Sequence, residues 1–99
     1  MKKITTKEAT MLFASKDDEQ VINLANKIVG VCDKYKDLAV DCSNIERHMV
    51  IDGSSFLGVI SVLTSGDKED STIVNFKATG EDEKIESFFS ELKEIAIGA

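Results

Sequence analysis

Apolar residues in this chain recur at two spacings that alternate along its length, and their order constrains the fold more than any other feature. A spacing of two residues is typical of a strand with one buried face, and a spacing of three or four is typical of an amphipathic helix. From the N-terminus, the spacings predict a strand, a helix, two strands, a helix, a strand and a helix. No repeat, low-complexity tract or proline interrupts this series, so we expect a single domain over residues 1–99.

Strand periodicity is clearest near the N-terminus, where Met11 and Phe13 share one face of a strand and Leu12 lies on the other. Residues 1–7 lack this alternation, and we expect them to form a polar lead-in. Asp52 and the glycine after it are typical of a turn that ends the third strand. The four predicted strands cover residues 8–14, 37–43, 47–51 and 71–78.

Helical periodicity marks three further segments. The first is predicted from about residue 17 to 34, where Ser15 and Asp18 resemble a capping box and acidic residues occupy the first turn. The second covers about residues 54–63 and starts at one of two adjacent serines. The third covers residues 81–97, with an apolar stripe made of Ile85, Phe88, Phe89, Leu92 and Ile95.

The order of these elements predicts the fold class. Two β-α-β units joined by a hairpin usually form an antiparallel sheet with its helices on one face. We therefore expect an α+β protein, an open-faced sandwich of order β-α-β-β-α-β-α with a four-stranded antiparallel sheet and three helices on one face. The core should lie between the sheet and the helices.

Charge and hydropathy exclude several classes of function. The net charge of −6 opposes a nucleic-acid partner, because such binding depends on lysines and arginines that displace counterions from phosphates. No run of about eighteen apolar residues is present, and no apolar stretch follows Lys2 and Lys3, so neither membrane insertion nor secretion is indicated. We expect a cytoplasmic protein.

Reactive groups that could support catalysis or metal binding do not cluster in the sequence. Cys32 and Cys42 lack a C-x-x-C spacing and lie on predicted apolar faces, so we expect buried, reduced thiols, with a disulfide or metal site as the alternative. The acidic runs at 17–19 and 81–83 suit helix starts better than cation sites. We expect no enzymatic activity, no cofactor and no metal site.

The segment VIDGSSFLGVISV, residues 50–62, together with the order of elements, resembles HPr, the histidine-containing phosphocarrier of the bacterial sugar phosphotransferase system. The resemblance spans about residues 8–96 and implies the HPr fold. In that family a histidine in a short His-Ala-Arg-Pro stretch at the start of the first helix carries the phosphoryl group. Helix-terminal amides and the arginine can stabilise that group.

The carrier stretch itself is missing from the matching region here. That region is SKDDEQVINLANK, residues 15–27, which contains no histidine, arginine or proline. It has Asp17, Asp18 and Glu19 instead, and their charge would repel a phosphoryl group. His48, the one histidine of the chain, lies on the third predicted strand, where we interpret it as a strand residue. A phosphocarrier that uses His48 remains the alternative hypothesis.

A second family site matches Ser55. In HPr proteins of many Gram-positive bacteria, a serine at the start of the middle helix is phosphorylated by a dedicated kinase, which changes the choice of partner. A phosphate there would accept backbone N–H bonds at the positive end of the helix dipole. Serine is also a favoured N-cap of any helix, so Ser55 has two interpretations, a cap alone or a regulatory phosphorylation site. Ser54 is the alternative cap.

The second predicted helix carries more apolar residues than one buried face requires. A helical wheel assigns Phe56 and Ile60 to the core together with Val59 and Leu63, and it places Leu57 and Val62 elsewhere. The resemblance implies a different assignment, in which Phe56, Leu57 and Ile60 face solvent and dock partner proteins. Leu57 faces outward in both interpretations. Local packing or a dimer contact is the alternative to docking.

The resemblance therefore implies a non-phosphocarrier, HPr-like protein that acts by binding other proteins, with Ser55 as a candidate phosphorylation site. A serine kinase, other enzymes of the phosphotransferase system or a transcription regulator are the expected partners. We expect a monomer or a weak dimer. A purely structural or oligomerisation module is the alternative from another functional class.

Overall fold

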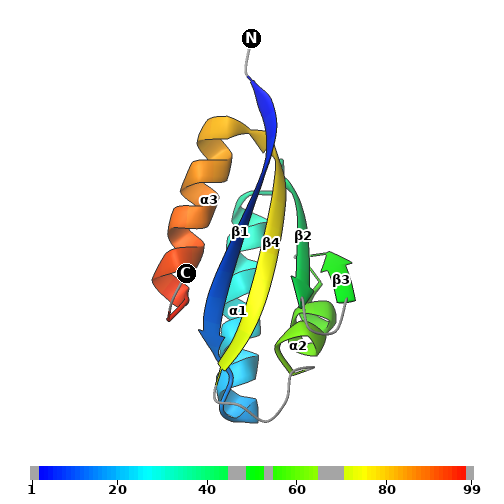
Figure 1. Cartoon of the computed structure of the whole chain (residues 1–99), viewed down its shortest axis with the longest axis vertical. Coiled ribbons are helices and arrows are strands. Elements are labelled where there is room, and N and C mark those ends of the chain that lie inside the picture. Colours follow the sequence, from blue (N-terminus) through cyan, green and yellow to red (C-terminus); the bar gives the residue numbers. More distant parts are fainter. Residues whose placement is uncertain (1–2, 45–48, 53–54, 65–70, 98–99) are drawn as a thin grey trace.

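The computed structural model describes residues 3–44, 49–52, 55–64 and 71–97 of the chain (Figure 1). The order of elements is β-α-β-β-α-β-α, which confirms the predicted α+β class. None of the described helices combines the length and the apolar content needed to cross a bilayer. The elements are β1 (Ile4–Ala14), α1 (Asp18–Lys34), β2 (Ala39–Asn44), β3 (Met49–Asp52), α2 (Phe56–Thr64), β4 (Ser71–Glu81) and α3 (Asp82–Ile95).

The four strands form one antiparallel sheet in the order β1-β4-β2-β3. The longest pairing joins β1 to β4 over their whole lengths, from Ile4 opposite Glu81 to Ala14 opposite Ser71. The three helices pack on one face of this sheet, with α1 behind its centre in the view of Figure 1. This arrangement confirms the predicted open-faced sandwich.

The core lies between the sheet and the helices, as expected from the strand alternation. Alternate residues of the strands point inward, and Phe13 of β1 and Phe76 of β4 meet edge-on with ring centroids 5.8 Å apart. Fully burying a side chain of this size stabilises the fold by about 1.5 to 3 kcal/mol. The helices contribute their buried residues, which are Val21, Leu24, Ala25, Ile28 and Cys32 of α1 and Ile85, Phe88, Phe89 and Leu92 of α3. The last four belong to the predicted stripe of the third helix, whose fifth member, Ile95, is partly buried.

The predicted polar lead-in over residues 1–7 is wrong from Ile4 onward, because β1 begins there. Residues 4–7 pair with the last four residues of β4, which itself extends to Glu81 beyond its predicted end at 78. Polar side chains satisfy one another along this part of the pair, as in the 2.9 Å contact between the hydroxyl groups of Thr6 and Thr79. Apolar alternation cannot detect a strand segment whose side chains are mostly polar.

α1 begins at Asp18, close to the predicted start at about residue 17, but its N-cap differs from the predicted one by two residues. Asp17 is the N-cap, and its side chain accepts a 2.8 Å hydrogen bond from the backbone N–H of Gln20. The Gln20 side chain in turn accepts from the N–H of Lys16 at 2.8 Å. Ser15 does not cap the helix, since its hydroxyl lies 2.7 Å from that of Thr72 on β4. Aspartate caps a helix as well as serine does, so both assignments fit the sequence pattern.

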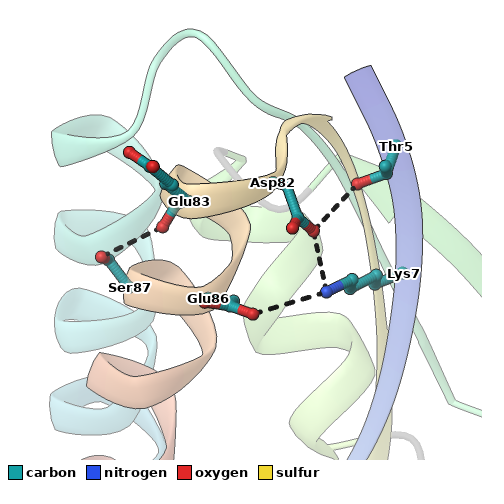
Figure 2. A network of polar contacts seen from close by, with 6 residues as sticks. All are labelled: Thr5, Lys7, Asp82, Glu83, Glu86 and Ser87. Atoms are coloured by element: carbon teal, nitrogen blue, oxygen red, sulfur yellow. Dashed lines mark hydrogen bonds and ion pairs between the residues drawn. The ribbon is translucent and has the colours of Figure 1, made fainter. Parts of the chain in front are cut away.

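A polar network joins the start of α3 to β1 (Figure 2). The Lys7 ammonium lies 2.8 Å from Asp82 and 3.7 Å from Glu86, and the Thr5 hydroxyl donates to the same Asp82 oxygen at 3.4 Å. The hydrogen bond from Lys7 lowers the pKa of Asp82 and raises the pKa of Lys7. The network therefore positions the first turn of α3 against the strand.

The lowered pKa of Asp82 makes stability depend on pH. A carboxyl whose pKa is lower in the folded state contributes stability above its unfolded pKa and loses that contribution as the pH falls through its folded pKa. We expect Lys7→Met to raise the pKa of Asp82 and to reduce the acid-induced loss of stability. Carboxyl NMR titration measures the pKa, and Lys34→Met, which removes a partner of Glu91 instead, should leave Asp82 unchanged. An unaltered Asp82 pKa in Lys7→Met would contradict the assignment.

Gly80 allows β4 to pass close to the segment before β2. Its φ is +159°, and a Cβ built on it would lie 2.4 Å from Cδ2 of the buried Leu38. We expect Gly80→Ala to lower the free energy of unfolding by about 1 to 3 kcal/mol, measured by urea denaturation. Gly30→Ala on α1 is the matched control, because no atom lies within 4 Å of its added Cβ. That variant should gain up to about 1 kcal/mol from helix propensity, and equal losses in both variants would refute the packing argument.

Candidate functional site

The start of α2 is organised around Ser55. The Ser55 hydroxyl accepts a 3.2 Å hydrogen bond from the N–H of Gly58, and its carbonyl accepts the first helical bond from Val59 at 2.8 Å. Its own N–H donates to the carbonyl of Asp52 at the end of β3, at 3.0 Å. Ser55 is thus the N-cap of α2, and its side chain is exposed.

Gly58 holds this first helical turn close to β3. A Cβ at Gly58 would lie 3.0 Å from Cδ1 of Ile51 and 3.2 Å from the Ser55 hydroxyl. These separations are tighter than ordinary contacts, so glycine permits α2 and β3 to approach one another. Sequence periodicity did not single out Gly58, although a glycine three residues after a capping serine is a visible signal.

Two large apolar side chains of the first turn of α2 reach solvent. Leu57 is 75% exposed and Phe56 is 36% exposed, whereas Ile60 is partly buried and packs against the core. The structure therefore exposes Phe56 and Leu57 beside the Ser55 cap, as the resemblance implied. Ile60, which the resemblance also places in solvent, is partly buried instead. No acidic residue lies in this turn. The surface formed by Ser55, Phe56 and Leu57 is called the α2 surface below.

The helical wheel was wrong about two residues of α2. Phe56, assigned to the core, reaches the surface, and Val62, assigned elsewhere, is fully buried. The buried side chains are Val59, Val62 and Leu63, so the inward direction is rotated by roughly 60° from the predicted one, at about 100° per residue.

Two buried polar side chains fix the rotation of α2, and both were missed by the sequence reasoning. Asn44 of β2 donates to the carbonyl of Val62 at 3.2 Å, and Thr72 of β4 donates to the carbonyl of Leu63 at 3.0 Å. They satisfy carbonyl groups at the end of α2 that have no partner within the helix. A polar residue at an inward strand position is the signal that could have identified them.

The start of α1, where the family has its carrier histidine, is acidic and exposed. Asp17, Asp18 and Glu19 all face solvent, and Asp17 caps the helix. Among the described residues, no group of histidine, cysteine and carboxylate side chains is arranged to hold a metal ion. His48 and Ser54 lie outside the described residues.

The two cysteines are buried and unbonded to one another, as expected. Burial raises the pKa of each thiol to about 12. Because the thiolate is the reactive form, neither group is activated as a nucleophile near neutral pH. Cys32 borders a cleft of about 360 Å³ whose other walls include Asp33, Asp41 and Asp52.

The cap geometry makes a prediction about stability. We expect Ser55→Ala to lower the free energy of unfolding by about 1 kcal/mol, because it removes the acceptor for the N–H of Gly58. Ser61→Ala is the matched control, since the Ser61 hydroxyl donates to the Leu57 carbonyl within the helix and alanine is the better helix former. Urea denaturation compares the two. Equal stability in both variants would show that Ser55 does not cap α2.

The fold was compared with known proteins. No family model matches the chain, and no curated protein matches it. Among solved structures, the fold is similar to the crystal structure of a phosphocarrier protein HPr from Bacillus anthracis strain Ames, with a TM-score of 0.62 and 12% sequence identity. The match covers 88% of this chain and 96% of that chain. This degree of likeness shows the fold, and the chain has the fold of HPr.

Proposed function

We propose that this HPr-like chain is a cytoplasmic regulatory protein that binds other proteins through the α2 surface and does not carry phosphoryl groups. The observation that supports this function is the exposure of Phe56 and Leu57 next to the exposed cap Ser55. Adjacent apolar anchors with a polar rim are typical of protein-docking sites. Ser61 and Thr64, also exposed, contribute to that rim.

Packing does not require Leu57 to be apolar, because its side chain is 75% exposed. The core beneath α2 is made by Val59, Val62 and Leu63, which are at most 2% exposed. A polar residue in place of Leu57 would leave that packing intact. A partner that covers Phe56 and Leu57 would bury an aromatic ring and a leucine, which are effective binding anchors.

Ser55 offers a means of controlling such docking. Its hydroxyl is accessible, and a phosphate at an N-cap accepts hydrogen bonds from the first-turn N–H groups at the positive end of the helix dipole. The first turn of α2 carries no carboxylate that would repel the phosphate. Phosphorylation would add about two negative charges beside Leu57. It would favour partners whose binding surface carries basic residues around an apolar centre, and it would disfavour partners whose binding surface is entirely apolar.

Loss of the carrier role follows from the residues at the start of α1. Phosphotransfer through a histidine needs an accessible imidazole among groups that stabilise the phosphoryl oxygens. Residues 15–27 contain no histidine or arginine, and the exposed carboxylates of Asp17, Asp18 and Glu19 would repel the incoming group.

Incubation with an HPr-specific serine kinase and ATP tests the proposal. We expect one phosphate on the wild-type chain, retained in Ser54→Ala and lost in Ser55→Ala, as measured by intact-protein mass spectrometry. Leu57→Ala should raise the KM for the kinase several-fold, because the docking contact is truncated. Ile73→Ala is the control for Leu57, since Ile73 is an exposed apolar residue on the opposite face of the sheet.

Three outcomes would contradict the proposal. Phosphorylation that persists in Ser55→Ala would exclude the site, and an equal KM change in Leu57→Ala and Ile73→Ala would exclude the docking surface. Phosphoenolpyruvate with the first enzyme of the phosphotransferase system should give no acid-labile adduct. An adduct lost in His48→Ala would establish the carrier role instead.

A further inference from the structure

β1 has an unpaired edge, because it pairs with β4 on one side and is the first strand of the sheet. Two hydrogen bonds show which of its residues face this edge. The N–H of Asp82 donates to the carbonyl of Lys3 at 3.2 Å and extends the ladder between β1 and β4 by one pair. The odd-numbered residues of β1 therefore direct their backbone groups toward β4. The carbonyl of Leu12 instead accepts from the N–H of Ile97, outside the sheet, at 2.8 Å.

The even-numbered residues of β1 therefore direct their backbone groups away from β4. Beyond the bond from Ile97, no backbone hydrogen bond within the described part of the chain reaches this edge. The exposed ladder extends over roughly 20 Å, the length of a typical docked strand. Its members are Ile4, Thr6, Glu8 and Thr10.

The C-terminal segment shows what this edge accepts. Ala96 has an extended backbone, with φ −72° and ψ 154°, and the next residue donates its N–H to Leu12 at the end of the open ladder. A strand added beside β1 would make the same kind of bond to Thr10 and then to Glu8.

Charge disfavours a second copy of this chain as the occupant. One two-fold antiparallel register pairs all four open residues, and it places Lys7 opposite Lys7 of the other copy. Each Lys7 belongs to a network with Asp82 and Glu86 that carries a net negative charge, so two like-charged networks would meet. The register shifted by one step toward the C-terminus along both strands places Glu8 directly opposite Glu8. The shift toward the N-terminus places Thr6 opposite Thr6 and pairs only Ile4, Thr6 and Glu8 of the four open residues with one another. Like charges directly opposite one another destabilise a strand pair.

The outer face of the sheet favours a cation opposite Glu8. Glu8 pairs with Lys77 of β4, Lys77 pairs with Asp41 of β2, and Asp41 pairs with Asp52 of β3. All four side chains are exposed, and three of them are acidic. The row alternates in charge from Glu8 through Lys77 to Asp41, and it ends in a like-charged pair, Asp41 opposite Asp52. A lysine or arginine on a strand added beside β1 would continue the alternation at the Glu8 end and offset the acidic excess of the row.

We infer that the open edge of β1 binds an extended, basic segment of another protein by strand addition, with a cationic side chain opposite Glu8. Backbone hydrogen bonds from the residues at 4, 6, 8 and 10 hold the segment, and Glu8 selects its charge. This site is separate from the α2 surface and does not depend on phosphorylation of Ser55.

Synthetic peptides test the inference with the full chain. The probes are capped peptides of about seven residues that alternate threonine and valine around one central residue, lysine in the basic probe and glutamate in the acidic probe. A third probe is the basic peptide with N-methyl groups on alternate backbone nitrogens. NMR titration should show shifts along β1, a Kd about threefold to fivefold lower for the basic than for the acidic probe, and no binding of the methylated probe.

Charge reversal supplies the matched variants. Glu8→Lys should reverse the preference between the two probes, and Glu94→Lys, a change of the same sign on an exposed residue of α3, should preserve it. Equal affinities for the two probes, shifts confined to other elements, or no binding up to about 1 mM would overturn the inference. A stable dimer in sedimentation that protects the amides of Thr6 and Glu8 would assign the edge to a second copy and would also overturn it.

Discussion

The pairing of β1 with β4 is the constraint on which the rest of this structure depends. Its register turns Met11 and Phe13 toward the same interior as Val74 and Phe76, which defines the face that the helices cover. The ladder continues from Lys3 to Asp82, so the same pairing also sets where α3 begins. Because β4 lies between β1 and β2, it is paired on both sides, and the unpaired edges fall to β1 and β3.

The sequence predicted the fold where buried apolar residues carried the pattern. The stripes of α1 and α3 and the inward face of β4 are strongly periodic, and they lie where expected. Prediction failed at residues 4–7 of β1 and at the end of β4, where backbone ladders and pairs such as Thr6 with Thr79 hold polar strands together. The number of ladder bonds that a strand makes depends on a partner distant in sequence, so local periodicity contains no measure of it.

The candidate site was predicted in part for a related reason. Ser55 and Leu57 were identified correctly as a helix start and an outward leucine, because both assignments depend on local preferences. The helical wheel could not orient Phe56 and Val62, because α2 has too few polar residues to indicate which of its faces is exposed to solvent. Its rotation is set by Asn44 and Thr72, which bind the carbonyl groups at the end of α2 from two different strands.

The length of α2 accounts for the exposed apolar surface without reference to any relative. A helix of nine residues that lies against a sheet and a neighbouring helix can bury about one third of its positions, and here those positions are Val59, Val62 and Leu63. Of the remaining apolar residues, Ile60 packs partly against the core, whereas Phe56 and Leu57 reach solvent and could be covered by a partner. Exposed apolar side chains promote nonspecific association, so their presence beside the Ser55 cap is a physical reason for the proposal that a partner covers this surface.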